Sequence, residues 1–241
     1  MILLIETATQ VCSVALSQGG EVLGELHSDE PNAHSARLST LVGQLLEQQH
    51  LSFSQLDAVC VSSGPGSYTG LRIGVSSAKG YCYALQRPLL SVPTLQSMAA
   101  VCFGQLPHFN GLVCPMIDAR RMECYTAFYR RTESGAIEEV RAVQADIIEP
   151  HIYDEFLDSQ EVLFIGDGAE KTKEILSVHP NAVYESSLPS SSAFRFQTSA
   201  AGMALIAEQK LKAGQTEDVA YFEPFYLKDF VAKKSVVRGL R

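Results

Sequence analysis

The sequence of 241 residues predicts an α/β protein of two similar lobes, each a mixed sheet flanked by helices. Short apolar runs alternate with segments of helical periodicity along the whole chain, which is typical of α/β domains. Each half begins with three strand-like segments and continues with helix, strand and helix. Between the halves, near residues 105–112, the sequence GQLPHFNG carries turn residues. We therefore expect one lobe over residues 1–107 and a second over 108–241.

The first half begins with the clearest pair of strands. Residues 12–17 and 21–27 are strand-like and are joined by a Gly-Gly turn, which predicts a hairpin. The helix that follows places leucines on one face at helical spacing. In order, we expect strands at 2–6, 12–17 and 21–27, a helix at 33–50, a strand at 56–66 ending in a glycine-rich loop, a helix at 68–86, a strand at 88–94, and a short helix from 95 to about 103.

The second half repeats this order of elements. Placing Asp118 on Glu6 also places Cys124 on Cys12 without a gap, and Ala127 then falls on Ala15. We expect a strand, a turn and a strand within 113–131, a third strand at 136–144, a helix at 146–159 broken near Pro150, a strand at 161–169 ending in a second glycine turn, a helix at 170–178, and a helix at 198–214 closed by Gly214.

Composition limits the classes of function. The formal net charge is −8 and the pI is about 5.3, so the chain lacks the excess of Lys and Arg that grips phosphate backbones, and a partner is expected to carry any nucleic acid. The six cysteines form no CxxC pair, which favours a reducing compartment over disulfides or zinc. The N-terminal apolar run ends at Glu6, so we expect neither a signal peptide nor a membrane span, and a cytoplasmic protein.

The order of strands and helices suggests an actin-like ATPase fold, in which the first hairpin of each lobe grips nucleotide phosphates and an acidic residue of the first strand helps to hold Mg²⁺. The candidates here are Glu6, Thr7, Thr9 and Asp118. The alternative is structural. On that interpretation the two acids end their strands, and the two threonines satisfy the backbone of the turn.

The glycine-rich loop SSGPGSYTGLRIG at 62–74 matches neither a Walker A motif, because no GK[ST] is present, nor a GxGxxG dinucleotide fingerprint. Its glycines allow a tight turn, and Ser67 or Thr69 can cap the following helix. Gly70, Gly74 and Ala78 then recur every fourth residue, so another backbone can approach this face closely. That backbone belongs either to the lobe's own sheet or to a helix of a partner. We expect Gly74→Leu to break complex formation and leave the fold largely intact, whereas global unfolding would support packing within the lobe.

Other motifs are missing or weak. No two histidines are spaced four residues apart, HExxH is absent, and no GxSxG elbow is present, so we expect no metal site and no hydrolase chemistry. The tail YLKDFVAKKSVVRGLR is basic. It is expected to be a solvated terminus, with contact to RNA phosphates as the alternative.

Several segments together resemble one family. IETATQVCSVAL, SSGPGSYTGLRIGVSSAKG, SVPTLQSMA, IDARRMECY and EPFYLK are similar to the TsaB proteins, also called YeaZ, and the match covers most of the chain in the same order. The resemblance implies a two-lobed actin-like (ASKHA, ribonuclease H-like) fold without catalytic activity of its own. It also implies a role as partner of TsaD, the related enzyme that forms threonylcarbamoyladenosine at position 37 of tRNAs reading ANN codons, with the ATPase TsaE joining them.

The resemblance further implies that a metal site is missing and where the partner binds. TsaD-like chains carry a helical HxxxH metal pair, whereas Thr94 and Met98 stand at those places here. It implies heterodimerisation with TsaD, a homodimer when alone, tRNA reached indirectly, no cofactor of the chain's own, and ATP or ADP only at the interface of the complex. The expected partner-binding residues are Leu38, Leu41, Leu45, Tyr68, Gly70, Leu71, Gly74 and Ala78. The alternatives are an active actin-like kinase or ATPase, favoured by Glu6 and Asp118, and a metal-independent peptidase.

Overall fold

The first half of the chain forms a five-stranded mixed sheet. The computed structural model describes residues 1–28, 30, 34–188 and 196–228. The strands of the first sheet have the order β3-β2-β1-β4-β5, in which β1 pairs antiparallel with β2 and parallel with β4. They are β1 (Ile2–Glu6), β2 (Cys12–Gln18), β3 (Glu21–Ser28), β4 (Ala58–Ser62) and β5 (Leu89–Val92). The hairpin predicted around the Gly-Gly turn is therefore confirmed.

The second sheet has the same topology, with the order β10-β9-β6-β7-β8. Its strands are β6 (Leu112–Asp118), β7 (Glu123–Arg131), β8 (Ile137–Ile147), β9 (Val162–Ile165) and β10 (Ala182–Tyr184). The register differs by one residue, because Glu6 pairs with Ser13 in the first lobe and Asp118 pairs with Cys124 in the second. The gapless alignment of the two halves therefore does not hold along both strands of the hairpin.

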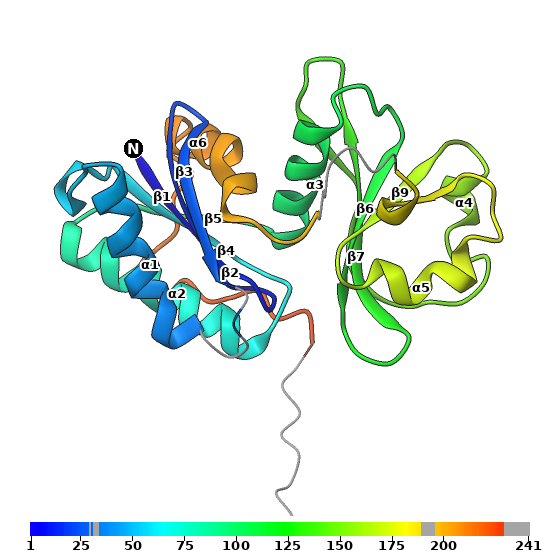
Figure 1. The fold of residues 1–241 in the computed structure, drawn as a ribbon, viewed down its shortest axis with the longest axis horizontal. Helices are drawn as coiled ribbons and strands as arrows, with labels where there is room; N and C mark the ends of the chain where they lie inside the picture. Colours follow the sequence, from blue (N-terminus) through cyan, green and yellow to red (C-terminus); the bar gives the residue numbers. More distant parts are fainter. Residues whose placement is uncertain (29, 31–33, 189–195, 229–241) are drawn as a thin grey trace, which may run out of the picture.

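Helices cover the outer face of each sheet (Figure 1). Helices α1 (His34–Gln48) and α2 (Tyr68–Leu85) bury their apolar sides on the first sheet. The short helix α4 (Asp154–Leu157) and α5 (Ala169–Leu176) do the same on the second sheet. Each buried aliphatic side chain stabilises such a layer by about 1.5–3 kcal/mol.

The two remaining helices are exchanged between the lobes. Helix α3 (Thr94–Gln105) follows the first sheet in the sequence but packs on the second, where Leu95 and Met98 join the core of β6, β7 and β9. The turn η3 (Ala200–Met203) and α6 (Ala204–Lys212) follow the second sheet but pack on the first. Figure 1 shows α3 and α6 between the two sheets. A boundary after residue 107 separates the two sheets but leaves α3 and α6 on the wrong side of it, because each packs on the other lobe's sheet. The division into two domains at this residue stays a prediction.

Two predicted helices differ in the structure. The helix expected at 146–159 is wrong for its first part, because β8 continues to Ile147 and only Asp154–Leu157 is helical. Strand pairing is favoured there because the Asp146 carboxylate accepts hydrogen bonds from Arg141 and Thr126 of the sheet, and from Tyr153 just before α4. The helix expected at 198–214 begins as the turn η3 and becomes α-helical at Ala204, and Gly214 adopts the left-handed φ of +67° that ends it.

Candidate functional site

The glycine-rich loop packs against the chain's own first strand. Ser67 caps α2, since its Oγ accepts a hydrogen bond from the Gly70 N–H at 3.2 Å. A Cβ built on Gly70 would overlap the carbonyl oxygen of Thr7, and one on Gly74 would overlap the Thr7 Oγ1. The Thr7 hydroxyl in turn donates to the Gly70 carbonyl at 2.9 Å. The small-residue stripe therefore serves packing within the lobe, and the intermolecular interpretation of this stripe is corrected.

Most of the residues expected to bind a partner lie in the interior. Their apolar side chains point toward the sheet because the helical periodicity that singled them out marks the core face. The buried ones are Leu38, Leu41, Leu45, Gly70, Leu71, Gly74 and Ala78. Tyr68 differs, since it is only half-buried, stacks on Tyr226 at 4.9 Å between ring centroids, and lies at the first turn of α2.

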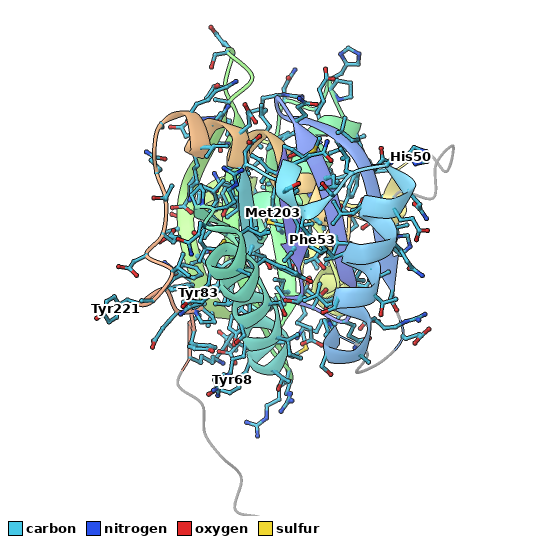
Figure 2. The ribbon with its side chains drawn as sticks, turned by 90° about the vertical axis from the view of Figure 1, so that its left-hand side faces the viewer. His50, Phe53, Tyr68, Tyr83, Met203 and Tyr221 are labelled. Atoms are coloured by element: carbon cyan, nitrogen blue, oxygen red, sulfur yellow. The ribbon has the colours of Figure 1, made fainter. Side chains whose placement is uncertain are left out.

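The surface that these helices offer is the opposite side, called here the α1–α2 outer face. It is made of the exposed residues of the two helices: Thr40, Gly43, Gln44 and Glu47 of α1 with Arg72, Ser76, Gly80 and Tyr83 of α2. Figure 2 looks onto this face and labels Tyr83 of α2, together with Phe53 of the short turn (Phe53–Gln55) that follows α1. Tyr83 is 77% exposed. Sequence reasoning could have found this face as the complement of the core stripe.

Two glycines in the middle of helices open onto this face. A Cβ built on Gly43 or Gly80 would meet no atom within 4 Å. Glycine in a helix interior costs about 1 kcal/mol relative to alanine. Neither glycine recovers that cost through close packing against the part of the chain that the structure describes. At these two points no side chain covers the helix backbone, so a second helix can approach it closely.

Glu6 is sealed beneath the loop that follows β1. Its Oε1 accepts hydrogen bonds from the Ala8 N–H at 2.6 Å and from the Ser62 hydroxyl at 2.8 Å. Burial raises the pKa of Glu6 to about 7, against the lowering effect of these hydrogen bonds. Its Oε2 has no hydrogen-bond partner among the described residues. Glu6 thus braces the loop from inside rather than facing solvent.

Thr9 also braces this loop. Its hydroxyl lies 2.5 Å from the hydroxyl of Thr198, and its carbonyl oxygen lies 2.9 Å from the His34 ring nitrogen. Together with the bond from Thr7 to Gly70, these contacts satisfy polar groups of the turn. They fit the structural alternative for the two threonines, and a role for Glu6, Thr7 and Thr9 in holding a nucleotide stays a prediction.

Asp118 ends β6 in an open setting. Its Oδ1 accepts hydrogen bonds from the Lys171 ammonium at 2.5 Å and from the Arg120 N–H at 2.7 Å. Burial raises the pKa of the Asp118 carboxyl, but these two donors outweigh it and the net pKa is lowered. The neighbouring Asp167, which accepts from the Asp118 N–H at 3.0 Å, has its pKa raised by burial. Asp118 is thus an ionised, lysine-paired carboxylate.

Residues 217–228, called here the C-terminal segment, join the two lobes. Lys79 of α2 donates hydrogen bonds to the carbonyls of Ala220 and Phe222, both at 3.1 Å. The Phe225 N–H then donates to the Ser63 carbonyl at 2.7 Å. Lys228 pairs with Glu123 of β7. The motif EPFYLK, which contributes to the family resemblance, lies in this segment, and the sequence did not predict its position in the fold.

A small apolar pocket of about 150 Å³ lies where this segment crosses between the lobes. It is lined by the glycine-rich loop at Gly64, by Leu95 of α3, by Tyr129 of β7 and by Phe225. Thr94 and Met98, at the positions where the resemblance placed a metal pair in TsaD, are buried in the interior. Among the described residues no three His, Cys, Asp or Glu side chains are grouped as metal ligands.

No helix in the part of the chain that the structure describes is long and apolar enough to cross a membrane.

Comparison with known proteins gives a consistent result. Residues 22–236 match the family model described as TsaD, tRNA N6-adenosine threonylcarbamoyltransferase. The chain is 34% identical to the tRNA threonylcarbamoyladenosine biosynthesis protein TsaB of Escherichia coli K12 over 98% of this chain and 97% of the relative. It is 33% identical to the Bacillus subtilis TsaB, over 73% and 74% of the two chains.

Solved structures agree with this match. YeaZ from Pseudomonas aeruginosa superposes with a TM-score of 0.78 at 25% identity, covering 94% of this chain and 99% of that one. A second Pseudomonas aeruginosa structure, described as an uncharacterized protein with similarity to peptidase YeaZ, gives a TM-score of 0.79 at the same identity. The predicted fold of two actin-like lobes is confirmed.

Proposed function

The chain belongs to the TsaB family of tRNA threonylcarbamoyladenosine biosynthesis proteins, and from this membership we propose that it acts as a non-catalytic subunit that binds and activates TsaD. Its role in this tRNA modification follows from the family. The proposal adds the division of labour. TsaD would transfer the threonylcarbamoyl group to adenosine 37 of tRNAs reading ANN codons, and this chain would hold TsaD in an active state.

The observation that supports this proposal best is the α1–α2 outer face. It combines exposed aromatic area at Tyr83 with two helix-interior glycines, Gly43 and Gly80, where an added Cβ would meet no described atom within 4 Å. Helices approach closely where small residues line their contact, and aromatic residues anchor protein interfaces. We propose that equivalent helices of TsaD dock here. In the absence of TsaD a second copy of this chain would occupy the same face, giving a homodimer.

The remaining partners follow the same scheme. TsaE joins the heterodimer, and tRNA reaches this chain through the complex. The chain needs no cofactor of its own, and ATP or ADP would bind only at an interface of the assembly. The protein would work in the cytoplasm, where its tRNA substrates are.

An active actin-like kinase or ATPase is the second reading of this fold, and the carboxylates of Glu6 and Asp118 are what favours it. Their settings support it poorly. Glu6 is fully buried with a pKa of about 7, and Asp118 is held by Lys171. Two ionised, accessible carboxylates would suit Mg²⁺ better. A metal-independent peptidase has no support from a grouped nucleophile and base in the residues described.

The test is a reconstituted transfer reaction with tRNA, threonylcarbamoyl-adenylate and TsaD, with and without this chain, and with this chain alone. Modified adenosine is counted by nucleoside mass spectrometry. We expect product to require TsaD and to rise sharply when this chain is added. Product formed by this chain alone would refute the non-catalytic role, and no change on addition would refute activation.

A matched pair of variants tests the binding face. Gly80→Leu adds a side chain to the α1–α2 outer face, and Gly104→Leu adds the same side chain to α3, where a Cβ also meets no atom within 4 Å. Both should fold, because leucine favours a helix over glycine by up to about 1 kcal/mol. Only Gly80→Leu should weaken TsaD binding and homodimerisation, by about tenfold or more. Equal binding by both variants in size-exclusion and calorimetric measurements would remove this face from the interface.

A further inference from the structure

The turn between β6 and β7 presents two consecutive arginines, and we propose that Arg120 and Arg121 bind the phosphate backbone of tRNA directly. The inference rests on the family's role in tRNA modification. It goes beyond the proposed function, in which tRNA reaches this chain only through the complex. Three observations carry it: the backbone of the turn, the free guanidinium groups, and the place where the basic tail begins.

The backbone of this turn is held in a conformation that arginine rarely adopts. Arg120 has a φ of +74° and Arg121 a φ of +54°, both in the left-handed region that favours glycine. The turn is fixed from below, because Asp118 accepts the Arg120 N–H at 2.7 Å and Lys171 donates to the Arg121 carbonyl at 2.8 Å. Lys171 also donates to the Glu123 carbonyl at 2.7 Å. Strain that the surroundings fix in this way is characteristic of functional turns.

Both arginine side chains are exposed and available to an anion. Among the described residues neither guanidinium group forms a hydrogen bond or an ion pair. The nearby carboxylates are already taken, since Asp118 pairs with Lys171 and Glu123 pairs with Lys228. Asp167 is turned toward the backbone N–H of Asp118. Arg120 also lies close enough to the Asp118 carboxylate to help lower its pKa. The turn therefore presents two exposed guanidinium groups on a fixed backbone, and this carboxylate offsets their charge only in part.

The chemistry of these groups selects a phosphate ligand. A guanidinium group matches two phosphate oxygens with parallel hydrogen bonds, and two neighbouring arginines can reach successive phosphates of one strand. The basic tail begins beside the same turn, because Lys228 contacts Glu123 and lies 6.0 Å from the centre of the Tyr125 ring. The sequence after it, DFVAKKSVVRGLR, carries four cations and one acid. Two exposed arginines and the nearby Lys228 in a chain of net charge −8 favour an extended polyanion.

The test measures binding of an unmodified tRNA transcript by fluorescence anisotropy at several salt concentrations, using the full chain alone and in complex with TsaD. The variant is Arg120→Gly with Arg121→Gly, which removes both charges and allows the left-handed backbone without strain. We expect tRNA affinity to fall about tenfold at low salt, and the slope of log affinity against log salt to decrease by roughly 1 to 2. The melting temperature should stay at or above that of the wild type.

Arg130→Ala is the matched control, because Arg130 is exposed on β7 but already paired with Glu138 at 2.8 Å. It should change tRNA affinity less than about twofold. Equal losses in the control and the double-glycine variant, or no loss in the latter, would overturn the proposal. The proposal would also be overturned if calorimetry showed that the two arginines are needed for ATP binding but not for tRNA binding. The double-glycine variant should still bind TsaD. If the wild-type chain does not bind TsaD, that result contradicts the proposed function and leaves the arginine proposal to be judged on tRNA binding by the chain alone.

Discussion

The two lobes share one topology, yet the acids that end their first strands have opposite environments. Glu6 is buried beneath the loop that follows β1, and this burial raises its pKa to about 7. Asp118 is open to solvent, ion-paired with Lys171, and has its pKa lowered. The repeated sheet thus fixes where an acid stands, while the groups packed around it set its pKa: burial beside Ala8 and Ser62 for Glu6, and the Lys171 ammonium for Asp118. Three experiments can break or sharpen this comparison.

The largest effect is expected at Gly74, which closes the first lobe over Thr7. A leucine there would overlap the Thr7 side chain, so Gly74→Leu should destabilise the fold by about 3 kcal/mol or more. This reverses the expectation from sequence, in which the fold survives and only the partner is lost. Gly104→Leu on α3, where a Cβ meets no atom within 4 Å, is the control and should not lower the melting temperature. Similar melting temperatures for wild type and Gly74→Leu would show that the loop yields easily.

The second effect concerns the pH dependence set by Glu6. Its pKa is higher in the folded chain than the ordinary value of 4.5, so the native state binds more protons than the unfolded state between about 4.5 and 7. Stability from this group is therefore present at low pH and is lost as pH rises through about 7. Glu6→Gln keeps the side-chain shape without a titrating proton. Relative to wild type, it should gain up to about 3 kcal/mol between pH 5 and 8.

Denaturant unfolding of both proteins at pH 5, 6, 7 and 8 measures this difference. Groups common to both proteins cancel in the comparison. Parallel stability curves for wild type and Glu6→Gln would mean that Glu6 is hydrated in solution and that the first lobe is more open than the structure has it.

The smallest effect is expected at Asp118. Its folded pKa lies below the ordinary 3.8, so its stabilisation is present above that pH and is lost as pH falls through the folded value. Because the side chain is 45% exposed, Asp118→Asn should cost less than about 1 kcal/mol at pH 7. The loss should shrink in high salt and vanish once the pH falls below the folded pKa of Asp118. A loss that persists in high salt would assign Asp118 a buried structural role like that of Glu6.

Much of the fold could be predicted because local patterns determine it. Alternation and the Gly-Gly turn were enough for the first hairpin, and repetition of the element order was enough for two lobes. The exchange of α3 and α6 could not be read locally, since Met98 and Ala207 are apolar residues that suit either sheet. The end of β8 was missed because Asp146 looks like a helix-start residue, whereas its partner Arg141 holds it in the sheet.

The candidate site was harder to predict for a related reason. Periodic apolar residues such as Leu38 and Leu45 point to the core, and the same signal cannot mark a partner. The small-residue stripe at Gly70 and Gly74 indicated a close approach correctly, but the approaching backbone is the chain's own at Thr7. The glycines that open outward, Gly43 and Gly80, lie on the complement of the core stripe, so the sequence marks their face but not what approaches it.

The exchange of helices also sets an order on folding during synthesis. The first sheet is complete once β5 has emerged, but the side of it that carries Ile2 and Leu90 stays uncovered until α6 follows, more than a hundred residues later along the chain. Helix α3 meanwhile has to wait for β6 and β7 to form its own contacts. Neither lobe can complete its hydrophobic core from its own half of the chain, so the nascent chain exposes apolar surface almost until synthesis ends. A chain truncated before residue 204 should therefore aggregate or need a chaperone.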